Sequence, residues 1–298
     1  MRWIREVQPQ PDQSRLYSQA LIITFGGNVL LATTKAVAAY LSGSVALYAD
    51  AANSVSDVVY SLLMVLGLRM AQRPPDLSHP QGHSRFEPLV GLVVTASMAY
   101  AGFEAARASI ERYLAGGSSI EVGLPTIILL GAAGIKLLMF LRIRWIAGRL
   151  GSPTLMTTAR DNLSDVLTST AALLGICASR ILSPLADPVA GFLVAGWIFR
   201  NVINAARENL GFLTGAGASE EKRKELVQIA ETVPGVQRVH HLMTEYAGPR
   251  LVVDLHINVD GNMTLNEAHA ISDEIIARLE AVKDVDRAYV HIEPEGYD

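Results

Sequence analysis

Six apolar segments, each long enough to cross a lipid bilayer, restrict most strongly how this chain can fold. A hydrocarbon layer about 30 Å thick needs roughly 20 residues of helix, which rises about 1.5 Å per residue. Helices suit this environment because they satisfy their backbone hydrogen bonds internally. Hydrophobic residues make up 50% of the 298 residues and charged residues 18%, which favours a membrane protein. We predict transmembrane helices over Ser18–Leu41, Val45–Ala71, Phe86–Leu114, Val122–Ile146, Pro153–Ile181 and Pro188–Phe212.

The basic residues indicate how these segments are oriented. Most of those that flank the segments belong to ends and loops that would share one side of the membrane: Arg2, Arg5, Arg15, Arg69, Arg73, Arg85, Arg142, Arg144 and Arg149. Loops rich in Lys and Arg stay on the cytoplasmic side. We therefore expect a multi-pass protein of the cytoplasmic (inner) membrane with both termini in the cytoplasm.

A second domain is expected after residue 213, where charged residues become frequent. The pattern of the remaining 80 or so residues predicts the order helix, strand, strand, helix, strand, which is typical of a small α+β domain with one sheet. The second helix opens with Thr264-Leu-Asn-Glu267, a capping box. We place the membrane domain at 1–213 and the cytoplasmic domain at 214–298. The other expected elements are the helix Ser219–Thr232 and the strands Val236–Tyr246, Arg250–Asp260 and Val285–Glu293.

Two pairs of polar side chains interrupt the apolar segments. Asn53 and Asp57 lie four residues apart in the second segment, and Asp161 and Asp165 in the fifth, so each pair shares one helix face. An ionised Asp at the bilayer centre costs about 2.5–3.5 kcal/mol even on the lenient insertion scale. Asp57 and Asp165 each lie about 18 Å from the end at which their segments enter the membrane, so both fall near the midplane.

A cation held between the two segments would compensate these carboxylates. Metal transport is therefore the leading hypothesis, and the alternative is a set of helix-capping or helix–helix polar contacts. Lys136 also lies in mid-membrane, in the fourth segment, and the sequence assigns it no partner.

Histidines outside the segments suggest two further metal sites. Asp76, His79 and His83 share the loop between the second and third segments, with metal-ligand spacing. Strand alternation turns His256, His291 and Glu293 away from the apolar face of the predicted sheet, where they can converge. The plainer interpretations are a solvated loop and an ordinary polar sheet face.

Several function classes are excluded or disfavoured. The formal net charge of −4 disfavours a nucleic-acid partner. A single cysteine, Cys177, excludes an intramolecular disulfide and a cysteine-rich zinc site. Nothing resembles a phosphate-binding loop, so ATP is not implied. We expect a carrier and not an enzyme.

The chain resembles the cation diffusion facilitator family, which comprises divalent-metal/proton antiporters. The resemblance rests on the segment Ser42-Gly-Ser-Val-Ala-Leu-Tyr-Ala-Asp50, the tetrad Asn53, Asp57, Asp161 and Asp165, the loop sequence His79-Pro-Gln-Gly-His83-Ser-Arg85-Phe-Glu87, and the strand histidines near the carboxyl terminus. It implies six transmembrane helices, a ferredoxin-like cytoplasmic domain, a homodimer, and export of a divalent metal in exchange for protons by alternating access.

The resemblance also implies roles for individual residues. Asn53, Asp57, Asp161 and Asp165 match the four ligands of the transport site. Asp76, His79 and His83 match a second, weaker site of some members, and His240, His256, His269, His291 and Glu293 match cytoplasmic metal-binding positions, some of whose ligands come from the partner chain. His241 would be a neighbour without a role.

The transport tetrad departs from the zinc-type pattern, in which at least one position is His. An all-oxygen set suits a harder ion, so the cargo expected is Mn²⁺, as in the manganese-type members. The alternatives are export of Fe²⁺, Zn²⁺ or Co²⁺, or a metal-sensing membrane scaffold that does not transport.

Overall fold

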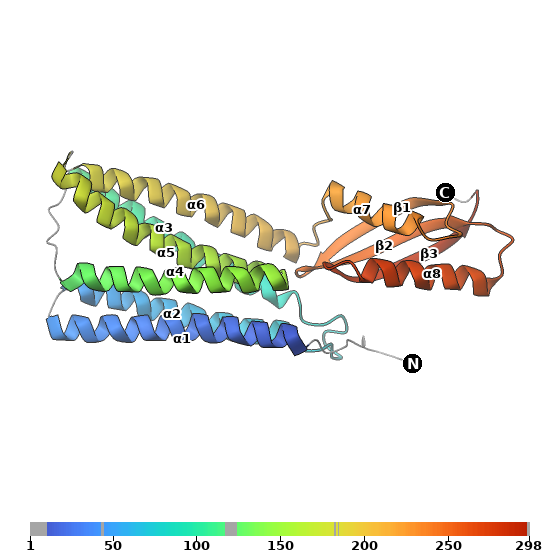
Figure 1. The fold of residues 1–298 in the computed structure, drawn as a ribbon, viewed down its shortest axis with the longest axis horizontal. Helices are drawn as coiled ribbons and strands as arrows, with labels where there is room; N and C mark the ends of the chain where they lie inside the picture. Colours follow the sequence, from blue (N-terminus) through green and yellow to red (C-terminus); the bar gives the residue numbers. More distant parts are fainter. Residues whose placement is uncertain (1–10, 43–44, 117–123, 182, 184, 297–298) are drawn as a thin grey trace. The chain divides into compact units, whose positions relative to one another are not determined.

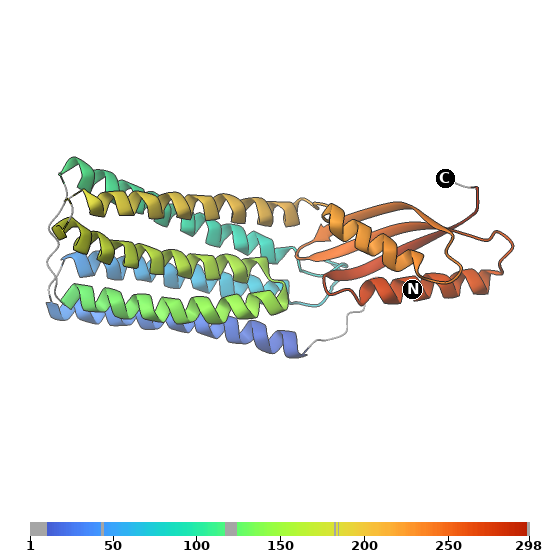
Figure 2. The same ribbon diagram turned by 45° about the horizontal axis from the view of Figure 1, so that its top comes forward.

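The computed structural model describes residues 11–42, 45–116, 124–181, 183 and 185–296 (Figure 1). The chain divides into two compact units, Met1–Asn209 and Leu210–Asp298. Six long helices make up the first unit and run side by side (Figures 1 and 2). They are α1 (Pro11–Ser42), α2 (Val45–Ala71), α3 (Phe86–Leu114), α4 (Leu124–Leu150), α5 (Pro153–Ile181) and α6 (Ala186–Leu213), whose last turn belongs to the second unit.

The six predicted helices are present, and α2, α3 and α5 have the predicted bounds. The differences lie at charged ends. The helix α1 starts at Pro11, before the apolar run, and α4 continues past Ile146 to Leu150. Apolar length marks the part of a helix that can lie in lipid, whereas arginine and lysine are good helix formers that extend a helix beyond it.

The core of the first unit is formed by α1 to α5. Its most buried side chains include Met64 of α2, Ile143 and Ile146 of α4 and Leu155 of α5, each no more than 1% exposed. Thr158 of α5 donates a hydrogen bond to the sulfur of Met64 (3.2 Å), which ties α5 to α2 at this level. The helices that carry the predicted tetrad therefore contact each other at Thr158 and Met64.

The helix α6 packs against α3 through glycines. A Cβ at Gly91 would lie 2.1 Å from Oδ1 of Asn209, and one at Gly102 would lie 3.0 Å from a methyl group of Ile198. The absence of a side chain lets α6 approach closely, as is common between membrane helices.

Large apolar side chains cover much of the outer surface of these helices, including Leu62, Leu138 and Leu193. By length and composition alone, four helices within the described residues could cross a membrane: 13–41, 54–71, 86–114 and 188–213. The first unit is a helical membrane domain.

The second unit has one layer of helices and one of strands. Its elements are α7 (Glu220–Glu231), β1 (Arg238–Ala247), β2 (Arg250–Val259), α8 (Leu265–Glu280) and β3 (Val285–Pro294). The sheet order is β1-β2-β3, with β1 antiparallel and β3 parallel to β2. This arrangement fits the expected ferredoxin-like α+β fold. The predicted capping box is present, because Thr264 accepts from the Glu267 amide and Glu267 accepts from the Thr264 amide.

The central strand β2 separates an apolar from a polar face of the sheet. Leu251, Val253, Leu255 and Ile257 are fully buried beneath α7 and α8, which lie over the same face (Figure 2). The intervening residues, among them His256, face the other way. This topology leaves one face of the sheet free of the unit's own helices and places the histidines on it.

Candidate metal sites

The carboxylates of α2 and α5 meet within the membrane domain, and a lysine lies between them. Lys136 of α4 places its Nζ 3.3 Å from Oδ2 of Asp57 and 2.8 Å from Oδ2 of Asp165. Asp57 and Asp165 therefore contact one common atom, and that atom is buried in the bundle. The expectation that α2 and α5 direct acidic groups at one point agrees with this geometry.

Lys136 is the residue of this site that sequence reasoning missed. Its side chain is 7% exposed, and its partners lie on other helices, 79 residues away for Asp57 and 29 residues away for Asp165. The signal in the sequence was its position in mid-segment, because an intramembrane lysine normally faces a partner in the bundle.

A small cavity of about 20 Å³ lies beside Asp57 and Asp161. It is large enough for one water-sized particle. Its lining includes Thr24 and Asn28 of α1, and Oγ1 of Thr24 and Oδ1 of Asn28 are buried oxygens without a hydrogen-bond partner among the described residues. Asn28 donates from Nδ2 to the backbone carbonyl of Asp57 (3.4 Å). The helix α1 thus adds neutral oxygen atoms next to the carboxylates.

Asn53 lies on α2, one helical turn before Asp57, but its side chain lies outside the described residues. Asp161 lies one turn before Asp165 on α5 and lines the cavity with Asp57. The oxygen set within the described residues therefore consists of three carboxylates. Asp57 and Asp165 contact Lys136, while Asp57 and Asp161 line the cavity.

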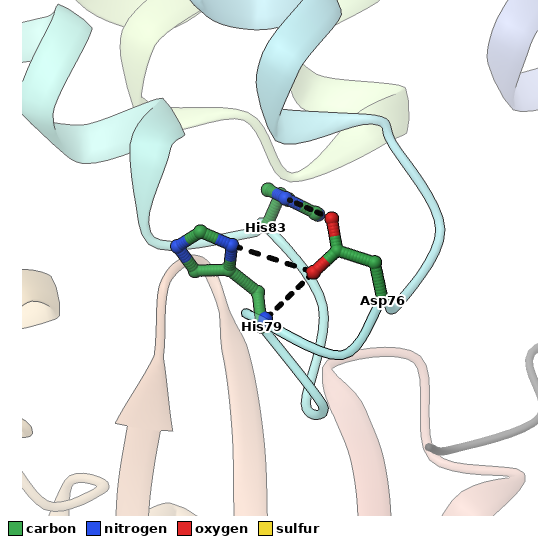
Figure 3. Close-up of side chains that lie close together, drawn as sticks. All are labelled: Asp76, His79 and His83. Carbon is green, nitrogen blue, oxygen red and sulfur yellow. Dashed lines mark hydrogen bonds and ion pairs between the residues drawn. The ribbon is translucent and has the colours of Figure 1, made fainter. Parts of the chain in front are cut away.

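The loop between α2 and α3 brings Asp76, His79 and His83 together (Figure 3). Oδ1 of Asp76 accepts the His79 amide (2.7 Å) and lies 3.6 Å from Nδ1 of His79, while Oδ2 lies 3.5 Å from Nε2 of His83. The amide of His79 lowers the pKa of the Asp76 carboxyl, so this group is ionised at neutral pH. His83 is 6% exposed, and its Nδ1 is buried with no hydrogen-bond partner in the part of the chain that the structure describes.

On the face of the sheet opposite α7 and α8, three histidines lie close to the carboxylate of Glu293. Its carboxylate lies 2.9 Å from Nε2 of His240, 3.3 Å from Nε2 of His291 and 3.9 Å from Nδ1 of His256. His240, His256 and Glu293 offer ligand atoms that all lie within 4.8 Å of one another. Asn258 positions His240, because its Oδ1 lies 3.1 Å from Nδ1 of that ring.

His241 lies beside this cluster, and His269 does not. A β-bulge between Val239 and His241 sets two residues of β1 against one of β2. As a result the ring of His241 lies 4.7 Å from that of His256 and lines the same hollow as His240. His269 is on α8, which covers the opposite face, and pairs with Asp273 (3.6 Å). A single chain therefore does not bring His269 to the cluster.

Among the residues that the structure describes, only the loop and sheet clusters contain three ligand atoms that are all mutually within 4.8 Å. The membrane carboxylates are held further apart, with the Lys136 ammonium between two of them. Together, a helical bundle with convergent intramembrane carboxylates and an α+β domain with a histidine cluster define the class: a membrane transporter of metal cations.

Comparison with known proteins agrees with this class. Residues 21–214 match the cation efflux transmembrane domain, and residues 218–295 match the cation efflux protein cytoplasmic domain. The chain belongs to the cation efflux family.

Relatives match over nearly their whole length. The "uncharacterized transporter" MJ0449 of Methanocaldococcus jannaschii is 31% identical over 94% of this chain and 99% of its own. The manganese efflux system protein MneS of Bacillus subtilis is 26% identical over 95% of this chain and 97% of its own. The cation-efflux pump FieF of Shewanella oneidensis is 26% identical over 94% of both chains.

Proposed function

We propose that this protein exports a divalent metal cation, Mn²⁺ above all, across the cytoplasmic membrane in exchange for protons. The observation that carries this proposal is the convergence of Asp57 and Asp165 on one atom inside the membrane domain. Isolated charges are expensive there, and a pair of acidic groups that meets in the bundle interior is typical of an ion pathway.

The transport ligands in this proposal are Asn53, Asp57, Asp161 and Asp165. Carboxylate and amide oxygens suit hard ions, whereas imidazole and thiolate favour zinc and copper. The name of the relative MneS supports the same ion. Fe²⁺ is the nearest competitor, followed by Zn²⁺ and Co²⁺.

Exchange with protons follows from the chemistry of the ligands. A carboxylate can hold a cation or a proton, so metal arriving from the cytoplasm and protons arriving from outside compete for the same oxygens. Alternating exposure of the site to the two sides then couples export to the proton gradient. The arginine distribution supports cytoplasmic termini and an outward direction of export.

The functions that we assign to the cytoplasmic domain, residues 214–298, are metal sensing and dimerisation. Metal bound by His240, His256, His291 and Glu293, with His269 supplied by the partner chain, would hold two cytoplasmic domains together when cytosolic metal is high. Because these ligands are imidazoles, Zn²⁺ can bind here without being transported. Asp76, His79 and His83 form a separate loop site.

Transport in proteoliposomes tests the proposal. Wild-type protein should carry Mn²⁺ across an imposed pH step faster than Fe²⁺, Zn²⁺ or Co²⁺. Asp57→Ala should abolish this flux, while Glu104→Ala, which removes an acidic group from α3 that contacts Arg107, should retain it. Equal Mn²⁺ flux in the Asp57 and Glu104 variants would refute the assigned site. Mn²⁺ flux that is the same with and without the pH step would refute proton coupling.

The ion preference has its own variant. Asn53→His adds the imidazole that the tetrad lacks, so it should raise Zn²⁺ flux relative to Mn²⁺ flux. An unchanged ratio of Zn²⁺ flux to Mn²⁺ flux would show that Asn53 does not determine which ion is transported.

A further inference from the structure

Lys136 places a basic side chain among the carboxylates that are proposed as the transport site. Its side chain is 7% exposed, and its Nζ contacts carboxylates of two different helices, Asp57 of α2 and Asp165 of α5. A lysine near a membrane surface can extend its ammonium to the headgroups. The side chain of Lys136 is instead enclosed in the bundle, where the carboxylates of Asp57 and Asp165 replace water as the hydrogen-bond acceptors of its ammonium.

The formal charges explain what such a lysine can do. Asp57, Asp161 and Asp165 carry three negative charges when ionised, and Lys136 compensates one of them. A divalent cation added to this set brings its total to zero, whereas the three carboxylates alone would hold the same cation with an excess negative charge. Lys136 therefore lowers both the cost of the empty site and its attraction for metal.

Building on the export function proposed above, we propose that Lys136 is a tethered counter-ion that occupies the empty transport site and that the incoming metal must displace. The ammonium lies at hydrogen-bond distance from the oxygens that the metal would bind. Divalent ions bind carboxylate oxygens at about 2.0–2.6 Å. An ion bound there would lie against the ammonium, and two positive charges cannot share these oxygens at contact distance.

The geometry around the site gives the metal a place to enter. Asp57 and Asp161 line the cavity, whereas Lys136 does not. Thr24 and Asn28 also line it, with side-chain oxygens that have no hydrogen-bond partner within the described residues. An ion that arrives there meets two carboxylates before it competes for the third. The four-carbon stem of lysine is flexible, so the ammonium can move away from Asp165 while the metal takes its place.

A tethered competitor makes binding weaker and release faster. The ammonium returns to Asp57 and Asp165 whenever the metal loosens, so it acts at a high effective concentration without diffusing away. Lys136 is thus a positioning and affinity-setting residue. It is not a ligand, because an ammonium has no lone pair to offer a metal.

The test is equilibrium binding of Mn²⁺ to the purified full-length protein in detergent, followed by the electron paramagnetic resonance signal of free Mn²⁺. The Asp57→Ala variant gives the baseline: Mn²⁺ bound by wild type in excess of this variant reports the membrane site, because the histidine sites are present in both. The variants Lys136→Met and Lys136→Gln remove the charge, and Lys136→Arg keeps it. Arg142→Met is the matched control, because it removes a positive charge from the same helix, where Arg142 contacts Gln19 and Trp145.

The expected result is at least tenfold tighter Mn²⁺ binding in both neutral variants. The dissociation constants for Mn²⁺ of Lys136→Arg and Arg142→Met should stay within threefold of the wild-type value. Export by the neutral variants should slow, because the metal is no longer expelled. Unchanged or weaker binding in folded Lys136→Met or Lys136→Gln would overturn the inference while leaving the export function intact. Failure of wild-type protein to show Asp57-dependent binding would instead refute the proposed transport site.

A second measurement needs no variant. Saturating Mn²⁺ should increase the labelling of Lys136 by an amine-reactive reagent, read by mass spectrometry, because the displaced amine loses its carboxylate partners. Labelling that Mn²⁺ leaves unchanged would also overturn the inference, even if the neutral variants did not fold.

Discussion

Replacing Asp165 with asparagine should destabilise the membrane domain even when no metal is present. The Nζ of Lys136 lies 2.8 Å from Asp165 and 3.3 Å from Asp57, so Asp165 is the nearer of its two anions. Asp165→Asn keeps the shape and an accepting oxygen but removes the charge. Asp57 remains as a partner, so the ammonium is not left fully unpaired. A fully unpaired buried ammonium would lower the free energy of unfolding by about 3–5 kcal/mol.

The magnitude follows from these contacts. A hydrogen bond to a charged group contributes about 1.5–3 kcal/mol, and coupling between polar side chains in a membrane bundle reaches about 1.7 kcal/mol. Asp165 is 35% exposed, and an amide oxygen still accepts a hydrogen bond from the ammonium, so we expect a loss of about 1–2 kcal/mol. The apparent Tm in detergent should fall by several degrees.

A double-mutant cycle gives the sharper assay. Lys136→Met should also lower the Tm, and the variant with both changes should lose less stability than the sum of the two single losses, by about 1–2 kcal/mol. Glu111→Gln is the control, because its carboxylate pairs with Arg107 at 2.9 Å on an exposed surface, and it should leave the Tm unchanged. Additive losses at Lys136 and Asp165 would refute the reasoning that these two residues stabilise each other.

Three further outcomes are expected. Glu293→Gln should weaken zinc binding to the cytoplasmic domain at least tenfold in calorimetry, because it removes the anion shared by three imidazoles, whereas Asp254→Asn on the neighbouring strand β2 should not. His83→Ala should remove one metal equivalent from the full chain without stopping Mn²⁺ flux; loss of flux would tie the loop to transport. Thr264→Ala should cost the second unit about 1 kcal/mol in urea unfolding, since the capping box with Glu267 loses its accepting hydroxyl, and an unchanged midpoint would contradict that role.

The sequence predicted well what depends on local patterns. Apolar length located six helices, and the helix and strand patterns of the charged carboxyl-terminal segment predicted its α+β fold. Alternation on β2 correctly assigned Leu255 to the core and His256 to the opposite face. The capping box at Thr264 was readable because its hydrogen bonds join residues three apart.

The sequence did less well where contacts join distant residues. It gave Lys136 no partner, because nothing local relates a residue of α4 to one on α2 that lies 79 positions away. It left out Asn28 and Thr24, whose unpartnered oxygens matter only because α1 packs beside Asp57. It did not predict the β-bulge in β1 that sets the ring of His241 beside that of His256.

The sequence by itself determined that the chain enters the membrane as helices, which stretches carry acidic groups to mid-depth, and which sheet face is polar. These properties follow from transfer free energy and from the repeat of each secondary structure. Only the tertiary structure decided which charges meet. The rotation of each helix about its axis is set by packing against its neighbours, and that rotation places the ammonium of Lys136 between Asp57 and Asp165.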